Sequence, residues 1–188
     1  MKRKILALML IISMFICSCG KSSTNSSEYE TKGESSNEKD VFVVSFESIT
    51  TDGGDFSSEE FKKSKLTMIN VWATYCSPCL KEMPDLGEIA SNYDSKDFQI
   101  IGIVSDVSTN SSNDDVAYAK KLIKETKANY PHLLLSESIY ANLVAGVDAV
   151  PTTFFVNDNG ELLNYVVGAN SKSGWEGIID ELLDEVNQ

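Results

Sequence analysis

Residues 41–188 are predicted to form an α/β domain, in which a central mixed β-sheet is covered by helices on both faces. Two largely apolar runs are typical of strands that are buried on both faces: 66–72, which is broken only by Thr67 and Asn70, and 98–104. After each run come segments with apolar residues every three to four positions, as in helices that pack on a sheet. Strands that alternate in this way with helices predict the layered α/β architecture.

The domain is expected to begin with a short strand at 41–47, a turn at 51–54 and a short helix. Ser57 and Glu60 have the spacing of a capping box, which predicts that this helix starts at Ser57.

The first long helix is predicted to begin at about Ser77, soon after the strand at 66–72. Pro84 lies inside this helix, where a proline removes one hydrogen bond and introduces a kink. The strand at 98–104 follows, and the polar segment 105–115 is expected to be a surface loop.

The second half of the domain continues the alternation and then ends in a hairpin and a helix. The expected elements are a helix from about Asp114, a brief strand at 133–135, a short helix at 139–145, strands at 152–156 and 161–167, and a last helix that carries Trp175. Asn159–Gly160 lies between the two late strands, and this dipeptide is a strong hairpin signal.

The N-terminal segment predicts export from the cytoplasm. Three basic residues at 2–4 precede an apolar run at 5–16, which is shorter than the roughly 20 residues that span a bilayer. A positive start and a short apolar run that ends in small residues describe a secretory signal peptide. The segment 16–20, Ile-Cys-Ser-Cys-Gly, resembles the lipobox of bacterial lipoproteins. Residues 1–18 are therefore expected to be removed and Cys19 to carry lipid, with an ordinary signal peptide as the alternative.

Residues 19–40 are expected to be the lipidated Cys19 and a disordered tether. The stretch 20–40 contains six serines and four glutamates, and its composition cannot bury enough apolar surface to offset the entropy of ordering.

The charge of the chain excludes some partners. The net charge is −12, from 16 basic and 28 acidic residues, and removing residues 1–18 takes away three basic residues and no acidic one, which leaves −15. Such a protein is not attracted to nucleic acid or to an anionic membrane by its own field. Attachment to the membrane would come from the lipid, in which each buried methylene contributes about 0.8 kcal/mol.

Of the four cysteines, only Cys76 and Cys79 remain in the folded domain. One pair is too few for a disulfide framework, so in an oxidising compartment we interpret it as a dithiol that cycles. The alternative is half of a zinc site, but zinc needs two further ligands. The chain has no second cysteine pair, and His132, its only histidine, is expected to be structural or exposed.

The position of the pair at a strand-to-helix junction favours redox chemistry. A helix N-terminus carries about half a positive charge, which stabilises a thiolate at Cys76 and makes it the expected attacking nucleophile. Cys79, one turn into the helix, is expected to be more buried and to resolve the mixed disulfide. Pro78 is tolerated between them because N–H groups in the first turn lack intrahelical partners.

Two segments carry a resemblance to a known family. Residues 70–84, Asn-Val-Trp-Ala-Thr-Tyr-Cys-Ser-Pro-Cys-Leu-Lys-Glu-Met-Pro, resemble the active-site segment of membrane-tethered thioredoxin-like proteins of the TlpA/ResA type. Residues 147–156, Val-Asp-Ala-Val-Pro-Thr-Thr-Phe-Phe-Val, resemble the segment around the cis-proline of that family. The resemblance covers essentially 41–188 and implies a thioredoxin-like fold.

The resemblance also implies roles for individual residues. It makes Cys76 the nucleophile and Cys79 the resolving thiol, with the Val150–Pro151 peptide bond cis and facing them. The backbone of Val150 would then pair with a bound substrate strand. Further substrate-binding residues would be Pro78 together with Trp72 and Tyr75 at the edge of the groove, although both aromatic residues have a core or rim position as the alternative.

The sequence departs from cytosolic thioredoxins at two positions. Asn70 stands where they carry a buried Asp, and an amide cannot take up the proton of the resolving thiol. Glu82, three residues after Cys79, is the compensating candidate that would tune or deprotonate Cys79, with a plain surface glutamate as the alternative. The second departure is Tyr75, which stands where many relatives have a tryptophan and bears on the shape of the groove.

The expected function is that of an extracytoplasmic, lipid-anchored thiol–disulfide oxidoreductase of a bacterial cell membrane. It would reduce disulfides of secreted or membrane proteins, in cytochrome c maturation or in recycling a methionine sulfoxide reductase. No cofactor is expected beyond the Cys76–Cys79 disulfide, and no metal. The resemblance implies a transmembrane thiol carrier as electron donor, and we expect a monomer. Alternatives are a disulfide-forming oxidase or isomerase, a peroxidase, and a metal-binding lipoprotein.

Overall fold

The computed structural model describes residues 41–188, so the predictions for 1–18, for Cys19 and for the tether up to residue 40 lie outside the described residues. The described residues contain a five-stranded sheet with the strand order β5-β4-β3-β6-β7. Its strands are β3 (Leu66–Trp72), β4 (Phe98–Ser108), β5 (His132–Leu135), β6 (Thr152–Asn157) and β7 (Leu162–Val167). Strand β4 is parallel to both β3 and β5, whereas β6 is antiparallel to both β3 and β7. The sheet is therefore mixed, as predicted.

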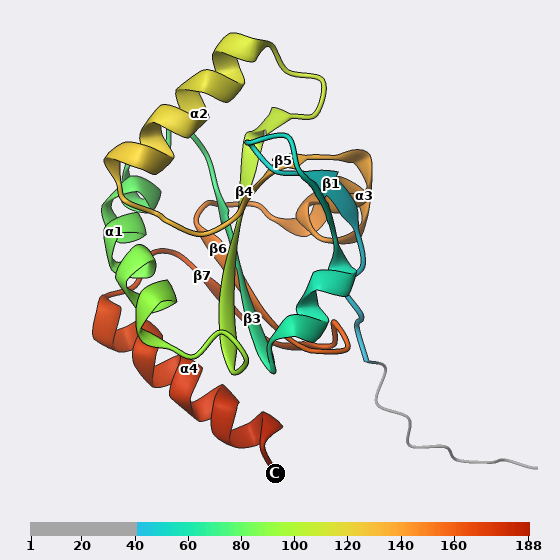
Figure 1. The fold of residues 1–188 in the computed structure, drawn as a ribbon, viewed down its shortest axis with the longest axis vertical. Coiled ribbons are helices and arrows are strands. Elements are labelled where there is room, and N and C mark those ends of the chain that lie inside the picture. The colour runs from blue at the N-terminus through green and yellow to red at the C-terminus, as the bar shows by residue number, and fades with distance from the viewer. Residues whose placement is uncertain (1–40) are drawn as a thin grey trace, which may run out of the picture. The chain divides into compact units, whose positions relative to one another are not determined.

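Helices cover both faces of this sheet (Figure 1). One face carries α1 (Ser77–Asn92), α2 (Asn113–Glu125) and α4 (Lys172–Val186). The other carries α3 (Glu137–Asn142), the 3-10 helices η1 (Ser58–Lys63) and η2 (Val144–Gly146), and the two-stranded sheet of β1 (Glu47–Ile49) and β2 (Asp55–Ser57). The thioredoxin-like fold class is confirmed.

The alternation of side chains along β3 explains why the sheet has a core on each side. All seven residues of β3 are buried. Ile69 and Val71 pack in the cluster under α3, whereas Met68 and Trp72 pack in the clusters under α1, α2 and α4. Side chains that alternate between two buried faces favour a nearly continuous apolar run, which is the pattern that predicted this strand despite Thr67 and Asn70.

Three predicted boundaries were wrong. The strand expected at 41–47 is reduced to a single bridge between Val43 and Glu161, because the backbone there pairs with the β6–β7 turn and not with a full strand. The capping box at Ser57 is absent, since Ser57 makes no side-chain capping bond and the helix that follows is 3-10. The loop expected at 105–115 is shorter, because β4 continues to Ser108.

The remaining elements agree with the sequence to within a few residues. Helix α2 begins at Asn113, where Ser112 and Asp115 form a complete capping box. Helix α1 begins at Ser77 as predicted and runs through Pro84, which is exposed. Within residues 41–188, none of the helices combines the length and the apolar character that crossing a bilayer requires.

Candidate active site

Cys76 and Cys79 lie where β3 gives way to α1. They are joined by a disulfide, with their Cα atoms 5.3 Å apart. Cys76 is the N-cap of α1, and its Sγ accepts a hydrogen bond from the backbone N–H of Cys79 at 3.2 Å. Cys79 is fully buried, whereas Cys76 is 5% exposed. The more accessible cysteine is therefore Cys76, as expected for the residue that attacks first.

The loop that leads into the disulfide is held by Asp106, from the unpredicted extension of β4. The Asp106 carboxylate accepts hydrogen bonds from the backbone N–H of Thr74 at 3.0 and 3.1 Å and from its hydroxyl at 2.5 Å. These bonds fix the loop one residue before Tyr75. Sequence analysis missed Asp106, because a single acidic residue in a polar stretch carries no pattern that distinguishes it.

The segment around Pro151 faces the disulfide. The Val150–Pro151 peptide bond is cis, as the resemblance implied. The carbonyl oxygen of Val150 lies 3.6 Å from Sγ of Cys76, although the two residues are 74 positions apart in sequence. The Thr152 hydroxyl donates to the carbonyl oxygen of Ala149 at 2.8 Å, which ties the start of β6 to this loop.

Glu82 is buried beneath the CxxC turn, with 4% of its surface exposed. Its Oε1 accepts a hydrogen bond from Nδ2 of Asn70 at 3.2 Å. Its Oε2 accepts from the backbone N–H of Asn170 at 3.1 Å and from the indole N–H of Trp175 at 3.3 Å. The surface-glutamate alternative is therefore wrong, and α1, β3 and the start of α4 all contribute to one carboxylate site.

The environment of Glu82 favours the protonated form of its carboxyl group more than the environment of an exposed glutamate does. Burial raises the pKa of Glu82, and the charge of Asp85 adds to that effect. The three hydrogen bonds from Asn170, Asn70 and Trp175 act in the opposite direction, because they stabilise the carboxylate. A buried carboxyl with a raised pKa, one helical turn from a redox cysteine, is a candidate for proton exchange with that cysteine.

Trp72 was predicted to lie either at the edge of the groove or in the core, and it lies in the core. The side chain is fully buried, and its indole N–H donates to Nδ1 of His132 at 3.1 Å. His132 is buried as well, with Nε2 lying 3.2 Å from the carbonyl oxygen of Ala128. Both residues therefore belong to the core, where each of their ring nitrogens has a polar partner.

Tyr75 and Pro78, by contrast, lie on the surface beside the disulfide. Tyr75 is 77% exposed and precedes Cys76, so its ring is available to a bound partner. Pro78 is exposed in the first turn of α1. Of the expected substrate-binding residues in the CxxC segment, the structure thus leaves these two accessible.

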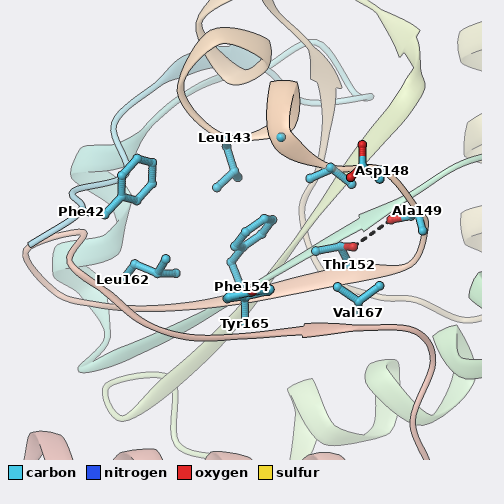
Figure 2. Close-up of a pocket in the computed structure, with 11 residues that line it drawn as sticks. Phe42, Leu143, Asp148, Ala149, Thr152, Phe154, Leu162, Tyr165 and Val167 are labelled. Carbon is cyan, nitrogen blue, oxygen red and sulfur yellow. Dashed lines mark hydrogen bonds between the residues drawn. The ribbon is translucent and has the colours of Figure 1, made fainter.

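An apolar pocket of about 510 Å³ lies next to the cis-proline loop. Figure 2 shows Phe42 and Leu162 at one end, Asp148 and Ala149 at the other, and Phe154 between them. Ala149 directly precedes Val150, so the loop that lines the pocket is the one that contacts Cys76. Sequence analysis did not predict the pocket, because its residues come from segments far apart in the chain.

The described residues offer no evident metal-binding cluster. Among residues 41–188, no three side chains of His, Cys, Asp or Glu lie together as ligands for a metal ion.

Comparisons with known proteins agree with this geometry. A family model described as Redoxin matches residues 30–183. The thiol-disulfide oxidoreductase ResA of Bacillus thuringiensis (strain Al Hakam) is 27% identical over 120 residues, which are 64% of this chain and 65% of that relative. The chain thus spans slightly less than two thirds of the relative's length.

Two solved structures share the fold at 26% identity. A thiol:disulfide interchange protein of the thioredoxin family from Chlorobium tepidum TLS has a TM-score of 0.62 and covers 75% of this chain and 94% of its own. The pneumococcal exposed lipoprotein thioredoxin Etrx1 from Streptococcus pneumoniae strain TIGR4 has a TM-score of 0.59 and covers 73% and 98%.

Proposed function

This chain is a member of the Redoxin family, and on that premise we propose that it is an extracytoplasmic thiol–disulfide oxidoreductase that reduces disulfides of secreted or membrane proteins. The observation that carries the proposal is the Cys76–Cys79 disulfide at the start of α1, with Sγ of Cys76 3.6 Å from the carbonyl oxygen of Val150. The name of the ResA relative, a thiol-disulfide oxidoreductase, supports the same activity.

The reaction begins from the reduced pair. The Cys76 thiolate attacks one sulfur of a substrate disulfide, which forms a mixed disulfide and releases the other substrate sulfur as a thiolate. The Cys79 thiolate then attacks Sγ of Cys76, which closes the Cys76–Cys79 disulfide and releases the second substrate thiolate. The substrate gains two electrons and, with two protons, becomes a dithiol. A membrane-bound dithiol donor restores the reduced pair by the same exchange in reverse.

The backbone at the start of α1 favours this order of attack. The N–H of Cys79 points at Sγ of Cys76, and a hydrogen bond of this kind at a helix N-terminus stabilises the thiolate after reduction. The substrate strand would pair with the backbone of Val150 in the cis-proline loop. Tyr75 and Pro78 would lie on the other side of the strand.

The direction of the reaction is tested by the reduction potential of the pair. The chain is equilibrated with glutathione or dithiothreitol buffers, and the fraction of the disulfide is measured. We expect a potential near that of thioredoxin, about −270 mV, whereas a value near about −120 mV would identify a disulfide-forming oxidase.

A trapping experiment tests the roles of the two cysteines. Cys79→Ser leaves Cys76 able to attack but removes the resolving thiol, so mixed disulfides with partner proteins should accumulate. Cys76→Ser is the matched control and should trap nothing. Equal trapping by both variants would contradict the assigned roles.

We further propose that Glu82 accepts the proton of Cys79 when the mixed disulfide is resolved. Its burial, its raised pKa and its position one helical turn after Cys79 support this role. Glu82→Gln keeps the size of the side chain but cannot take up a proton, and its amide group replaces one of the two oxygens that accept hydrogen bonds. We expect slower resolution of the mixed disulfide at neutral pH, measured by stopped-flow thiol exchange. Unchanged thiol pKa values together with unchanged rates would defeat the proposal.

Attachment to the membrane through Cys19 belongs to the same proposal. The name of the pneumococcal relative, an exposed lipoprotein thioredoxin, supports it. Cys19→Ser should release the protein into the medium, whereas Cys17→Ser should not, because residue 17 would leave with the signal peptide. Release of the wild type and of both variants alike, with no lipid detected by mass spectrometry, would argue for an ordinary signal peptide.

A further inference from the structure

A row of polar side chains crosses the sheet beneath α1. In the strand register, Thr153 of β6 pairs with Asn70 of β3, Asn70 pairs with Gly102 of β4, and Gly102 pairs with His132 of β5. Paired residues on neighbouring strands point to the same face of a sheet. Thr153, Asn70 and His132 are all buried, so the apolar core contains a polar layer, which is interrupted at Gly102.

The two ends of the row are hydrogen-bonded separately. At one end, Nδ2 of Asn70 donates to Oε1 of Glu82 at 3.2 Å and to Oγ1 of Thr153 at 3.1 Å. At the other end, His132 accepts from Trp72 and lies against the carbonyl of Ala128.

Gly102 leaves room between these two ends. The His132 ring occupies part of the space over Gly102, since a Cβ there would lie 2.2 Å from Nδ1 of His132. The Tyr130 ring stacks on the His132 ring, with the ring centroids 4.4 Å apart and an interplanar angle of 30°. Tyr130 packs against both core clusters on this face of the sheet, the one around Trp72 and Cys79 and the one around Trp175.

Two buried polar atoms of this region have no hydrogen-bond partner among residues 41–188. They are Oδ1 of Asn70 and the hydroxyl of Tyr130. A buried polar atom that stays unpaired destabilises the folded state. The pKa of Tyr130 is raised, first by burial and then by the charge of Glu82. One atom can only accept and the other can donate, which is the pairing that a single water bridges.

We propose that one structural water is bound between the Tyr130 hydroxyl and Oδ1 of Asn70. It accepts a hydrogen bond from Tyr130 and donates one to Asn70, which joins the two ends of the polar row. A buried water makes about three hydrogen bonds, and the Glu82 carboxylate is the remaining partner. Tyr130 is thereby a positioning residue, which acts on Glu82 through this water and through Asn70.

The water would matter most when Glu82 is ionised. A carboxylate in an apolar core is stabilised by each hydrogen bond that it accepts, directly or through a water. Around Glu82, the titratable groups are Asp85 and, after reduction, Cys79 on α1, together with Tyr130. Asn70, Asn170 and Trp175, which contact it from other elements, do not titrate. The effect on thiol exchange rests on the proposed role of Glu82, whereas the water site itself does not.

The direct test is a crystal structure of the oxidised chain at a resolution that shows ordered water. We expect a density peak within hydrogen-bonding distance of both the Tyr130 hydroxyl and Oδ1 of Asn70. A Tyr130 hydroxyl bonded directly to a protein atom, or no peak at this position, would overturn the proposal.

The second test is the titration of the Glu82 carboxyl carbon by NMR in Tyr130→Phe, which removes only the hydroxyl. We expect a higher pKa for Glu82 in this variant, because the carboxylate loses a water-mediated hydrogen bond. Tyr93→Phe is the matched control, since the Tyr93 hydroxyl bonds to Asp180 at 2.8 Å and takes no part in the polar row. An unchanged titration of Glu82 in Tyr130→Phe would count against the positioning role. Neither test measures catalysis, so failure of the proposed oxidoreductase function would appear separately, in the exchange assays.

Discussion

Both ring nitrogens of His132 are occupied when the ring is neutral. Nδ1 accepts the indole N–H of Trp72, and Nε2 faces the carbonyl oxygen of Ala128, which assigns the proton to Nε2. Protonation of Nδ1 would place its N–H opposite the indole N–H of Trp72, so that two donors would face each other. Burial accordingly lowers the pKa of His132 to about 4, against the smaller opposing effects of Ala128 and Asp52.

This residue predicts a loss of stability in mild acid. The folded-state pKa is below the unfolded value of about 6.5, so the unfolded state binds the proton first as the pH falls. The free energy of unfolding should therefore decrease between pH 6.5 and 4 by about 3 kcal/mol, and the loss should level off below pH 4. Urea unfolding at a series of pH values measures it.

The matched variant for this prediction is His132→Gln, which retains an acceptor for Trp72 but does not titrate. Its stability should fall less steeply over the same pH range. Glu82 has the opposite effect on how the free energy of unfolding depends on pH. Because its folded-state pKa is raised, the stability that it contributes at low pH is lost as the pH rises. The difference between the wild type and His132→Gln isolates the histidine, and equal slopes would contradict the assignment.

At the scale of elements, β4 serves the site at two points along its length. Its unpredicted end carries Asp106, which holds the loop before the disulfide, and Ser105, whose hydroxyl donates to the carbonyl oxygen of Trp72 at 3.0 Å. Its middle carries Gly102, which makes room for His132. A single parallel strand thus positions both the CxxC turn and the polar layer below it.

Gly102→Ala should disrupt the polar layer. The added methyl group would lie 2.2 Å from Nδ1 of His132, which must move and release the Trp72 indole. We expect a loss of about 2–4 kcal/mol in the free energy of unfolding, measured by urea denaturation, from overpacking together with a broken buried hydrogen bond.

Gly177→Ala is the control, because a Cβ at Gly177 meets nothing within 4 Å in α4. That variant should be neutral or more stable, by up to about 1 kcal/mol. Equal effects of the two substitutions would show that the space over Gly102 is not occupied as described.

The parts of the fold that the sequence predicted are those whose pattern is local. The apolar run of β3, the start of α1 at Ser77 and the Asn159–Gly160 hairpin each follow from neighbouring residues. The extension of β4 to Ser108 was missed because three of its four residues are polar and its reason is tertiary: Asp106 bonds to Thr74, 32 positions away. The core position of Trp72 likewise depends on His132, 60 positions away, which no local pattern reveals.

For the whole molecule, the described residues carry three core clusters of their own. A variant that lacks residues 1–40 should therefore match a variant that lacks only 1–18 in its free energy of unfolding and in its reduction potential. Urea denaturation and equilibration with glutathione measure both quantities. A less stable shorter variant would show that the segment 19–40 contributes to the folded domain.

The two tryptophans of this chain can serve as intrinsic fluorescence probes of the site. Trp72 and Trp175 are its only indoles, and both are fully buried. Trp72 packs in the cluster that contains both sulfurs and bonds to His132, while Trp175 bonds to Glu82. All of the indole fluorescence of the protein thus originates beside the disulfide, the histidine or the glutamate. Turnover and proton uptake can be followed as changes in emission, with no label attached.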